Sequence, residues 1–257
     1  MFIARLMKLP PHPHPIVSLT SFPARINNVW QVVECMLRQT YQPAKIILWL
    51  SKEQFPNPDE LPDSLKSRVG DGFEIRMVDG DIRSHKKYYY VAKEYPESLV
   101  FLVDDDIYYD SGILERTMKA YQEHPNSIIC NYGYRMLRDK EGNLMPYNSW
   151  PRELHYSEGK ELFFGSGGGT LFRPCELHKE LTNIEKAREL APIADDVWLN
   201  GIVRLSEKNI VLLDNGQILP IANKNNVTLA SDNKGHSEND VQLKNVTSFL
   251  SQFNVRF

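Results

Sequence analysis

An apolar segment that runs directly into three carboxylates constrains the fold of this chain more than any other feature. Residues 99–103 read LVFLV, and Asp104, Asp105 and Asp106 follow without a spacer. Unbroken apolarity over a short β-rich run is typical of a strand covered on both faces. Adjacent carboxylates repel each other by about 1 kcal/mol per close pair in water and about 4 kcal/mol at an effective dielectric constant near 20. We therefore expect a buried strand whose acidic end attracts a cation.

The rest of the first half alternates apolar runs with helical patterns. Such alternation predicts an α/β fold with a mostly parallel sheet and right-handed crossovers, in which ligands bind at the carboxyl ends of the strands. The triple aspartate lies at such an end. The expected strands are residues 16–21, 45–50 and 73–78, and the expected helices are residues 26–37 and 85–95.

The second half is less regular. Residues 138–161 are polar and rich in turns, and the glycine cluster GSGGG at 165–169 lies between two short apolar runs. We find no repeat and no linker, and expect one domain over residues 1–257. The further elements expected are helices at 113–124, 195–205 and 241–253 and strands at 127–134 and 209–214.

Composition excludes several classes of protein. A chain of 257 residues, 42% hydrophobic and 25% charged with a net charge of −3, is an ordinary globular protein and not a nucleic-acid binder. Three cysteines without metal-type spacing argue against a disulfide framework or a zinc site and favour the cytoplasm. No apolar run approaches the ~20 residues of a membrane span, and the first fifteen residues lack a signal-peptide core.

The three aspartates predict a metal site. In an extended backbone Asp104 and Asp106 project to one side, about 6.6 Å apart along the strand, while Asp105 points to the other. Mg²⁺ and Mn²⁺ prefer oxygen ligands, and Mg²⁺ commonly takes one or two carboxylates and completes its shell with waters and phosphates. A solvated acidic turn at a strand end is the alternative. Position after a buried strand favours the Mn²⁺ or Mg²⁺ site.

At these aspartates the chain resembles the nucleotide-sugar-dependent glycosyltransferases of the GT-A fold, whose DxD motif ends a central strand. Three further segments resemble bacterial polysaccharide transferases of the family-2 type and, more distantly, exostosin-like transferases. They read VSLTSFPARI, DIRSHKKYYY and ADDVWLNGI. The resemblance covers residues 16 to 202. It implies a Rossmann-like sheet of GT-A type, with a nucleotide-sugar-binding half over about 16–110 and an irregular acceptor-binding half over about 111–257.

The donor site implied by this resemblance draws on loops that follow the first, third and fourth strands. The alternatives are a helix cap for Ser21, a surface charge for Arg25 and a solvated helix face for the lysines. The candidates are Thr20, Ser21 and Arg25 for base and ribose, Asp79 or Asp81 for the base, Lys86 or Lys87 for the diphosphate or the acidic cluster, and Asp104 and Asp105 beside the metal.

A second acidic pair, Asp195 and Asp196, begins a predicted helix, where the macrodipole also favours acids that have no catalytic role. An inverting transferase needs a carboxylate to accept the proton of the attacking hydroxyl. The resemblance makes Asp196 the candidate, because it aligns with the second acid of an ED-type motif. In retaining relatives the same motif orients substrate, so the stereochemistry stays open.

The remaining candidates belong to the acceptor side and to the metal. GSGGG fits neither a Walker loop nor GxGxxG, and the resemblance places Gly167, Gly168 and Gly169 beside the donor sugar and acceptor, where missing side chains leave room for a pyranose. A flexible turn is the alternative. Trp150 could stack on a sugar. His236 could be a third metal ligand, although a lone exposed histidine is commoner.

The resemblance implies a metal-dependent hexosyltransferase. It would move a sugar from a nucleotide diphosphate sugar, with uridine expected before guanosine, to a hydroxyl of a glycan or lipid-linked glycan in bacterial polysaccharide, lipopolysaccharide or capsule synthesis. We expect it in the cytoplasm, with peripheral contact to the inner face of the membrane left open. The alternatives are a sugar nucleotidyltransferase, which normally has a glycine-rich loop after the first strand, and a non-catalytic glycan-binding protein.

Overall fold

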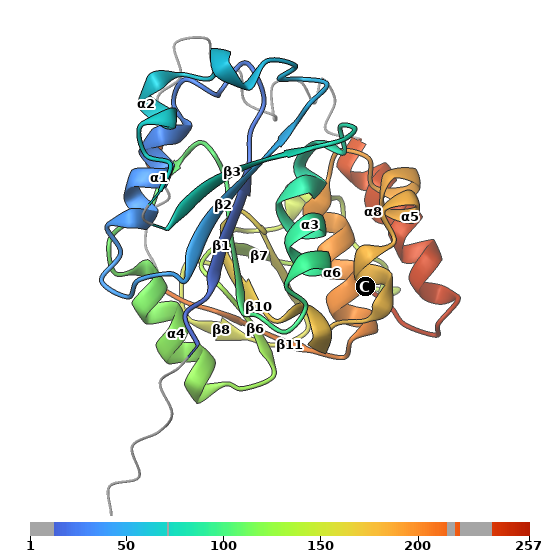
Figure 1. Cartoon of the computed structure of the whole chain (residues 1–257). Helices are drawn as coiled ribbons and strands as arrows, with labels where there is room; N and C mark the ends of the chain where they lie inside the picture. Colours follow the sequence, from blue (N-terminus) through green and yellow to red (C-terminus); the bar gives the residue numbers. More distant parts are fainter. Residues whose placement is uncertain (1–12, 71, 215–218, 222–237) are drawn as a thin grey trace, which may run out of the picture.

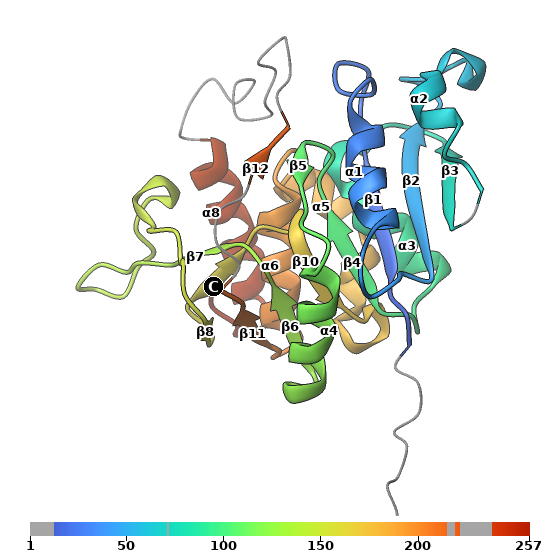
Figure 2. The ribbon, with the colours of Figure 1, turned by 90° about the vertical axis from the view of Figure 1, so that its left-hand side faces the viewer.

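One eight-stranded sheet organises the chain, in the order β3-β2-β1-β4-β10-β6-β11-β8. The computed structural model describes residues 13–70, 72–214, 219–221 and 238–257. Two further pairs, β5 with β12 and β7 with β9, form small ribbons beside the sheet (Figure 2). The strands are β1 Ile16–Thr20, β2 Lys45–Ser51, β3 Phe73–Val78, β4 Val100–Val103, β5 Ile107–Tyr108, β6 Ser127–Cys130, β7 Gly133–Arg135, β8 Ser157–Glu158, β9 Leu162–Phe164, β10 Gly168–Phe172, β11 Asn209–Leu212 and β12 Leu219–Pro220.

Six of the eight strands run in one direction. β3, β2, β1 and β4 are parallel neighbours, and β6 is parallel to β11. β10 lies antiparallel between β4 and β6, and β8 lies antiparallel at the edge. The predicted α/β fold with a mostly parallel sheet is confirmed, and it is compatible with a Rossmann-like architecture. Strands from both halves of the chain belong to this one sheet, whereas the functional division near residue 110 stays a prediction.

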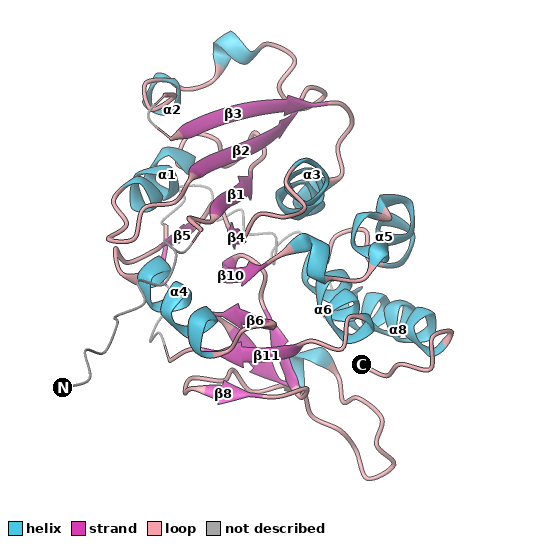
Figure 3. Ribbon diagram, turned by 60° about the horizontal axis from the view of Figure 1, so that its bottom comes forward, coloured by secondary structure: helices cyan, strands magenta, loops and turns pink. Residues whose placement is uncertain are grey.

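Helices cover both faces of the sheet (Figure 1), as the apolar strands predict. α1 and α4 lie on one face, and α3, α6, α5 and α8 lie on the other (Figure 3). Side chains of β1 alternate between two cores: Val17 and Leu19 pack with residues of α1 and α4, while Ile16 packs with α3. The helices are α1 Val29–Leu37, α2 Asp63–Lys66, α3 Lys86–Glu94, α4 Ile113–Glu123, α5 Ile184–Leu190, α6 Asp195–Leu205 and α8 Glu238–Ser251.

Some predicted bounds differ from those in the structure. The first helix begins at Val29, because residues 23–28 form turns. The strand expected over 127–134 is divided into β6 and β7, which belong to different sheets. α8 packs on the domain itself, since Gly201 of α6 leaves room for Val246, whose Cγ1 lies 2.7 Å from the position of an added Cβ. Among the described helices, none is both long enough and apolar enough to cross a bilayer.

Candidate active site at the carboxyl end of the sheet

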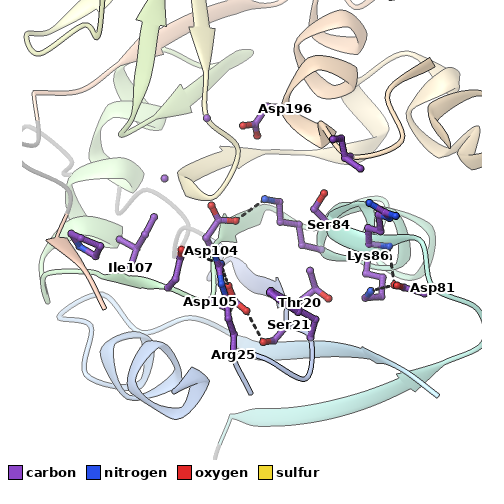
Figure 4. A pocket seen from close by; sticks show the side chains of 18 of the residues that line it. Thr20, Ser21, Arg25, Asp81, Ser84, Lys86, Asp104, Asp105, Ile107 and Asp196 are labelled. Atoms are coloured by element: carbon purple, nitrogen blue, oxygen red, sulfur yellow. Dashed lines mark hydrogen bonds and ion pairs between the residues drawn. The ribbon is translucent and has the colours of Figure 1, made fainter. Parts of the chain in front are cut away.

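A cavity of about 670 Å³ lies beyond the carboxyl ends of β1 to β4, where ligands bind in open α/β sheets. Loops after these strands form one side, and the turn before β10 and the start of α6 form the other (Figure 4). It is lined by Thr20, Ser21, Phe22, Arg25, Gln54, Asp81, Arg83, Ser84, Lys86, Lys87, Asp104, Asp105, Asp106, Ile107, Tyr132, Gly165, Gly168, Ile193, Asp196 and Pro220.

The three aspartates lie in a turn between β4 and β5, not on the strand. The expected alternation along an extended backbone is therefore wrong for them. Asp105 is buried and accepts hydrogen bonds from Ser21 Oγ at 2.5 Å and Arg25 Nη1 at 2.7 Å. Arg25 also forms an ion pair with Asp106 at 3.0 Å. One arginine thus ties the loop after β1 to two of the three carboxylates.

These contacts exclude the purely structural alternatives for Ser21 and Arg25, a helix cap and a surface charge. Ser21 does not cap α1, whose N-cap is Asn28, and Arg25 is no surface charge because it is only 5% exposed. Both line the cavity and shape the acidic turn. Thr20 also lines it, while its Oγ1 donates to the Trp49 carbonyl at 2.8 Å.

Lys87 joins the two acidic motifs. Its Nζ lies 2.7 Å from Asp104 Oδ1 and 3.1 Å from Asp195 Oδ2. Ser166 continues the chain of contacts: its Oγ donates to Asp195 Oδ2 and its backbone N–H donates to Asp196 Oδ1, each at 2.7 Å. Figure 4 shows Asp104 and Asp196 on opposite sides of the cavity. Residues from four segments therefore form one polar network.

The network carries more negative than positive charge. Burial, with repulsion from Asp104, raises the pKa of Asp106 to about 6. Burial and the adjacent Asp195 raise the pKa of Asp196 to about 7. Burial acts in the same direction on Asp195, but the attraction of Lys87, together with His85 and the hydrogen bond from Ser166, outweighs it and holds the Asp195 pKa below its usual value. Burial disfavours the charged form of Lys87, yet Asp104 and Asp195 raise its pKa. A further cation would relieve the repulsion among the carboxylates.

The two partly exposed carboxylates of the turn could hold a hard divalent cation only together with oxygen ligands from outside the chain. The side chains of Asp104 and Asp106 are 39% and 32% exposed beside the cavity. Within the described ranges no three His, Cys, Asp or Glu residues group so that they could hold a metal. The rest of a coordination shell would have to come from water and phosphate oxygens, which is the usual arrangement for Mg²⁺. His236, the expected third ligand, lies outside the described residues.

The glycine cluster divides into different roles. A Cβ on Gly167 would lie 1.8 Å from Cγ of Asp104, so only glycine permits this approach. Gly168 lines the cavity, and its own Cβ would lie 2.3 Å from Tyr132 Cβ. Gly169, at φ +97°, sits where the β10 register shifts and packs on Phe101, and it is not among the cavity residues. Gly167 is not among the cavity residues either, so the predicted place beside the substrate is supported by position for Gly168 but not for Gly167 or Gly169.

Three other candidates lie away from the cavity surface. Asp79 is exposed and pairs with Lys52 at 2.8 Å. Trp150 is 4% exposed and packs against Phe163, so it offers no platform for a sugar. Asp195 is 6% exposed and does not line the cavity, so its position suits support of the site better than contact with substrate.

Asp81 and Lys86 lie on the cavity but pair with each other. Asp81 also accepts hydrogen bonds from Gln54 Nε2 at 2.8 Å and from the Arg83 backbone N–H at 2.9 Å. Lys86 is 1% exposed, which excludes the solvated-face alternative. Of the two lysines, Lys87 holds the acidic cluster and Lys86 does not.

Sequence reasoning missed several residues of the site. Ser166 was visible only as the single hydroxyl side chain within the glycine cluster. The Tyr109 hydroxyl accepts from the Asp104 backbone N–H at 2.8 Å and donates to the Gly167 carbonyl. Its only signal was its position five residues after the first aspartate.

The chain matches no protein-family profile and no curated protein. The function proposed below therefore rests on the geometry of the cavity and on the resemblance of the short motifs that meet there.

Proposed function

We propose that this protein is a metal-dependent glycosyltransferase of GT-A type that moves a sugar from a nucleotide diphosphate sugar to a hydroxyl of a glycan acceptor. One observation carries the proposal: the loop after β1, the start of α3, the DxD turn and the start of α6 line a single cavity although they are far apart in sequence. These are the segments on which the resemblance to such enzymes depends. The DxD turn also follows a central strand of the sheet.

On the donor side, Asp104 and Asp106 would hold Mn²⁺ or Mg²⁺. The bound metal would supply charge neutralisation for the departing diphosphate. Arg25 and Ser21 hold Asp105 in place within the turn, and its two neighbours line the cavity beside it. Thr20 lies on the same wall, within the part of the cavity that we assign to the nucleoside.

On the acceptor side, Asp196 is the group suited to handle the attacking hydroxyl. Its pKa of about 7 means that an appreciable fraction is ionised near neutral pH and can accept a proton. The Ser166 N–H donates to one carboxylate oxygen and so orients the group. In an inverting reaction Asp196 would take the hydroxyl proton; in a retaining one it would orient substrate.

The variant Asp106→Asn tests the metal site. We expect Mn²⁺-dependent turnover of nucleotide sugars to be abolished while the circular dichroism spectrum and unfolding transition remain, because Arg25 still pairs with Asp105. Asp110→Asn is the matched control from the same segment, since Asp110 pairs with Arg116 and is not a cavity residue. Full metal-dependent activity in Asp106→Asn would contradict the proposal.

The products separate this proposal from its alternatives. A glycosyltransferase releases a nucleoside diphosphate, whereas a nucleotidyltransferase releases pyrophosphate from a nucleoside triphosphate. Calorimetric binding of glycan without metal-assisted nucleotide binding would favour a non-catalytic protein. Screening uridine and guanosine diphosphate sugars identifies the base. The acceptor, which we expect to be a free or lipid-linked glycan, and a cytoplasmic or membrane-peripheral location stay predictions.

A further inference from the structure

Lys87 is a buried cation between two acidic motifs that belong to opposite sides of the cavity. It is 3% exposed, although it lies in the first turn of α3. Its ammonium contacts Asp104 from the turn after β4 and Asp195 from the start of α6. Ser18 Oγ of β1 donates to the Lys87 carbonyl at 2.5 Å and so anchors the first turn of the helix to the sheet.

The position of this ammonium places it in competition with a metal ion. Asp104 is one of the two carboxylates assigned to the metal, and Lys87 already neutralises part of its charge. A divalent cation at Asp104 would lie close to the ammonium, and two like charges a few ångströms apart in a partly buried site repel each other strongly. Lys87 must therefore weaken metal binding relative to a site without it.

The same ammonium connects Asp104 to the acceptor side. Asp195 receives both Lys87 and Ser166, and Ser166 holds Asp196 through its backbone N–H. A change of charge at Asp104 alters the field on Lys87, and a displacement of Lys87 alters the support of Asp195. A continuous series of ion pairs and hydrogen bonds of 2.7 to 3.1 Å therefore connects Asp104 to Asp196.

We propose that Lys87 is a positioning residue: an internal counter-ion that limits metal affinity at Asp104 and couples metal occupancy to the acceptor-side acids. This inference rests on the proposed function, because it takes Asp104 as a metal ligand. In this role Lys87 neither binds phosphate nor donates a proton. The buried Asp195, which contacts both Lys87 and Ser166, transmits the effect of the metal toward Asp196.

Substitution of Lys87 separates this role from a purely structural one. In Lys87→Met we expect Mn²⁺ alone to bind about tenfold more tightly or better, because the like charge is gone. We also expect kcat for nucleotide-sugar turnover to fall, because Asp104 and Asp195 are no longer held together. A purely structural lysine would instead give a looser site with weaker Mn²⁺ binding. Lys87→Arg keeps the charge and should restore the wild-type affinity.

The experiment is a calorimetric titration of the full chain with Mn²⁺, with folding checked by circular dichroism. Lys86→Met is the matched control, because Lys86 is the adjacent buried lysine but pairs with Asp81. Its Mn²⁺ affinity should change much less than that of Lys87→Met. If Lys87→Met fails to fold, Lys87→Met/Asp195→Asn removes the buried pair together. This double variant should bind Mn²⁺ more tightly than Asp195→Asn alone.

The outcomes distinguish the two proposals. Mn²⁺ binding that Asp104→Asn abolishes, but that stays unchanged or weakens in folded Lys87→Met, overturns the role of Lys87 and leaves the proposed function intact. Absence of Mn²⁺ binding in the wild type, with and without uridine or guanosine diphosphate, overturns both.

Discussion

At the scale of single residues, ion pairs connect the walls of the cavity, and the acidic side chains in these pairs outnumber the basic ones. Arg25 and Lys87 together contact four aspartates, namely Asp104, Asp105, Asp106 and Asp195. Asp196 has no ion pair among the described residues and depends on the Ser166 N–H. The free energy of folding must therefore include a repulsive contribution from this cluster, which protonation or a bound cation would remove.

The pH dependence of stability should reveal this repulsion. A carboxyl group whose pKa is higher in the folded protein than in the unfolded chain stabilises the fold when protonated. For Asp196, with a pKa of about 7 against about 4 unfolded, that stabilisation is complete below pH 4 and is lost as the pH rises to 7. Asp196→Asn removes this pH-dependent loss of stability. The free energy of unfolding of the variant, relative to that of the wild type, should therefore rise by on the order of 2 kcal/mol from pH 5 to pH 8.

Urea unfolding at several pH values, without metal, measures this difference. The charged groups around Asp196 are Asp195, Lys87 and Asp104, which are present in both proteins. Parallel stability curves for wild type and variant would show that Asp196 is not repelled in the folded state.

At the scale of elements, the turn between β9 and β10 decides how the two sides of the cavity meet. The register of β10 shifts at Gly169, near the start of the strand and beside the DxD turn. Gly167 then lies against Asp104, and its carbonyl accepts from both the Asp104 N–H at 3.1 Å and the Tyr109 hydroxyl. The turn before the antiparallel strand β10 thus positions the carboxylate of Asp104, which follows the parallel strand β4.

Gly167→Ala should damage the site more than the fold. The added Cβ must displace the Asp104 side chain, and a misplacement of about 1 Å in catalytic geometry can cost on the order of 100-fold in rate. We expect that loss in metal-dependent kcat/KM, with about 1 to 3 kcal/mol of stability lost to overpacking.

Gly142→Ala is the control for glycine replacement, measured by the same kinetics and by urea unfolding. Gly142 has φ +85° with nothing within 4 Å of an added Cβ, so it should lose about 1 kcal/mol of stability through backbone strain and keep its activity. Equal activity losses in the two variants would contradict the role given to Gly167.

At the scale of the whole molecule, the cavity exists only because distant segments fold onto one sheet. Its walls come from loops after β1 to β4, from the turn before β10 and from α6. A ligand that fills it contacts all of these at once and binds only the folded chain. Ligand binding should therefore stabilise the whole domain and not one segment.

Thermal unfolding measures that linkage. Mn²⁺ with the correct nucleotide diphosphate, at about 100 times the dissociation constant, should add about 2.7 kcal/mol of stability. For a chain of this size that corresponds to roughly 5 to 10 °C in Tm. Asp106→Asn should show no metal-dependent shift. A wild-type Tm that is indifferent to Mn²⁺ and to both nucleotides would remove the basis for a donor site.

The amino-acid sequence by itself determined the elements that depend on local patterns. β3 at Phe73–Val78 and α6 at Asp195–Leu205 have the bounds that apolar runs and acidic first-turn residues predict. The sequence also determined that carboxylates follow a buried strand. These features depend on neighbours within a few residues, which the sequence displays directly.

The tertiary structure alone decided which member of each candidate pair faces the cavity. Lys86 and Lys87 are adjacent, but about 100° of helical rotation sends one to Asp81 and the other to Asp104. It likewise decided that β10 runs antiparallel and that Trp150 is buried. Each of these outcomes depends on partners far away in sequence, and no local pattern encodes which distant partner will be adjacent after folding.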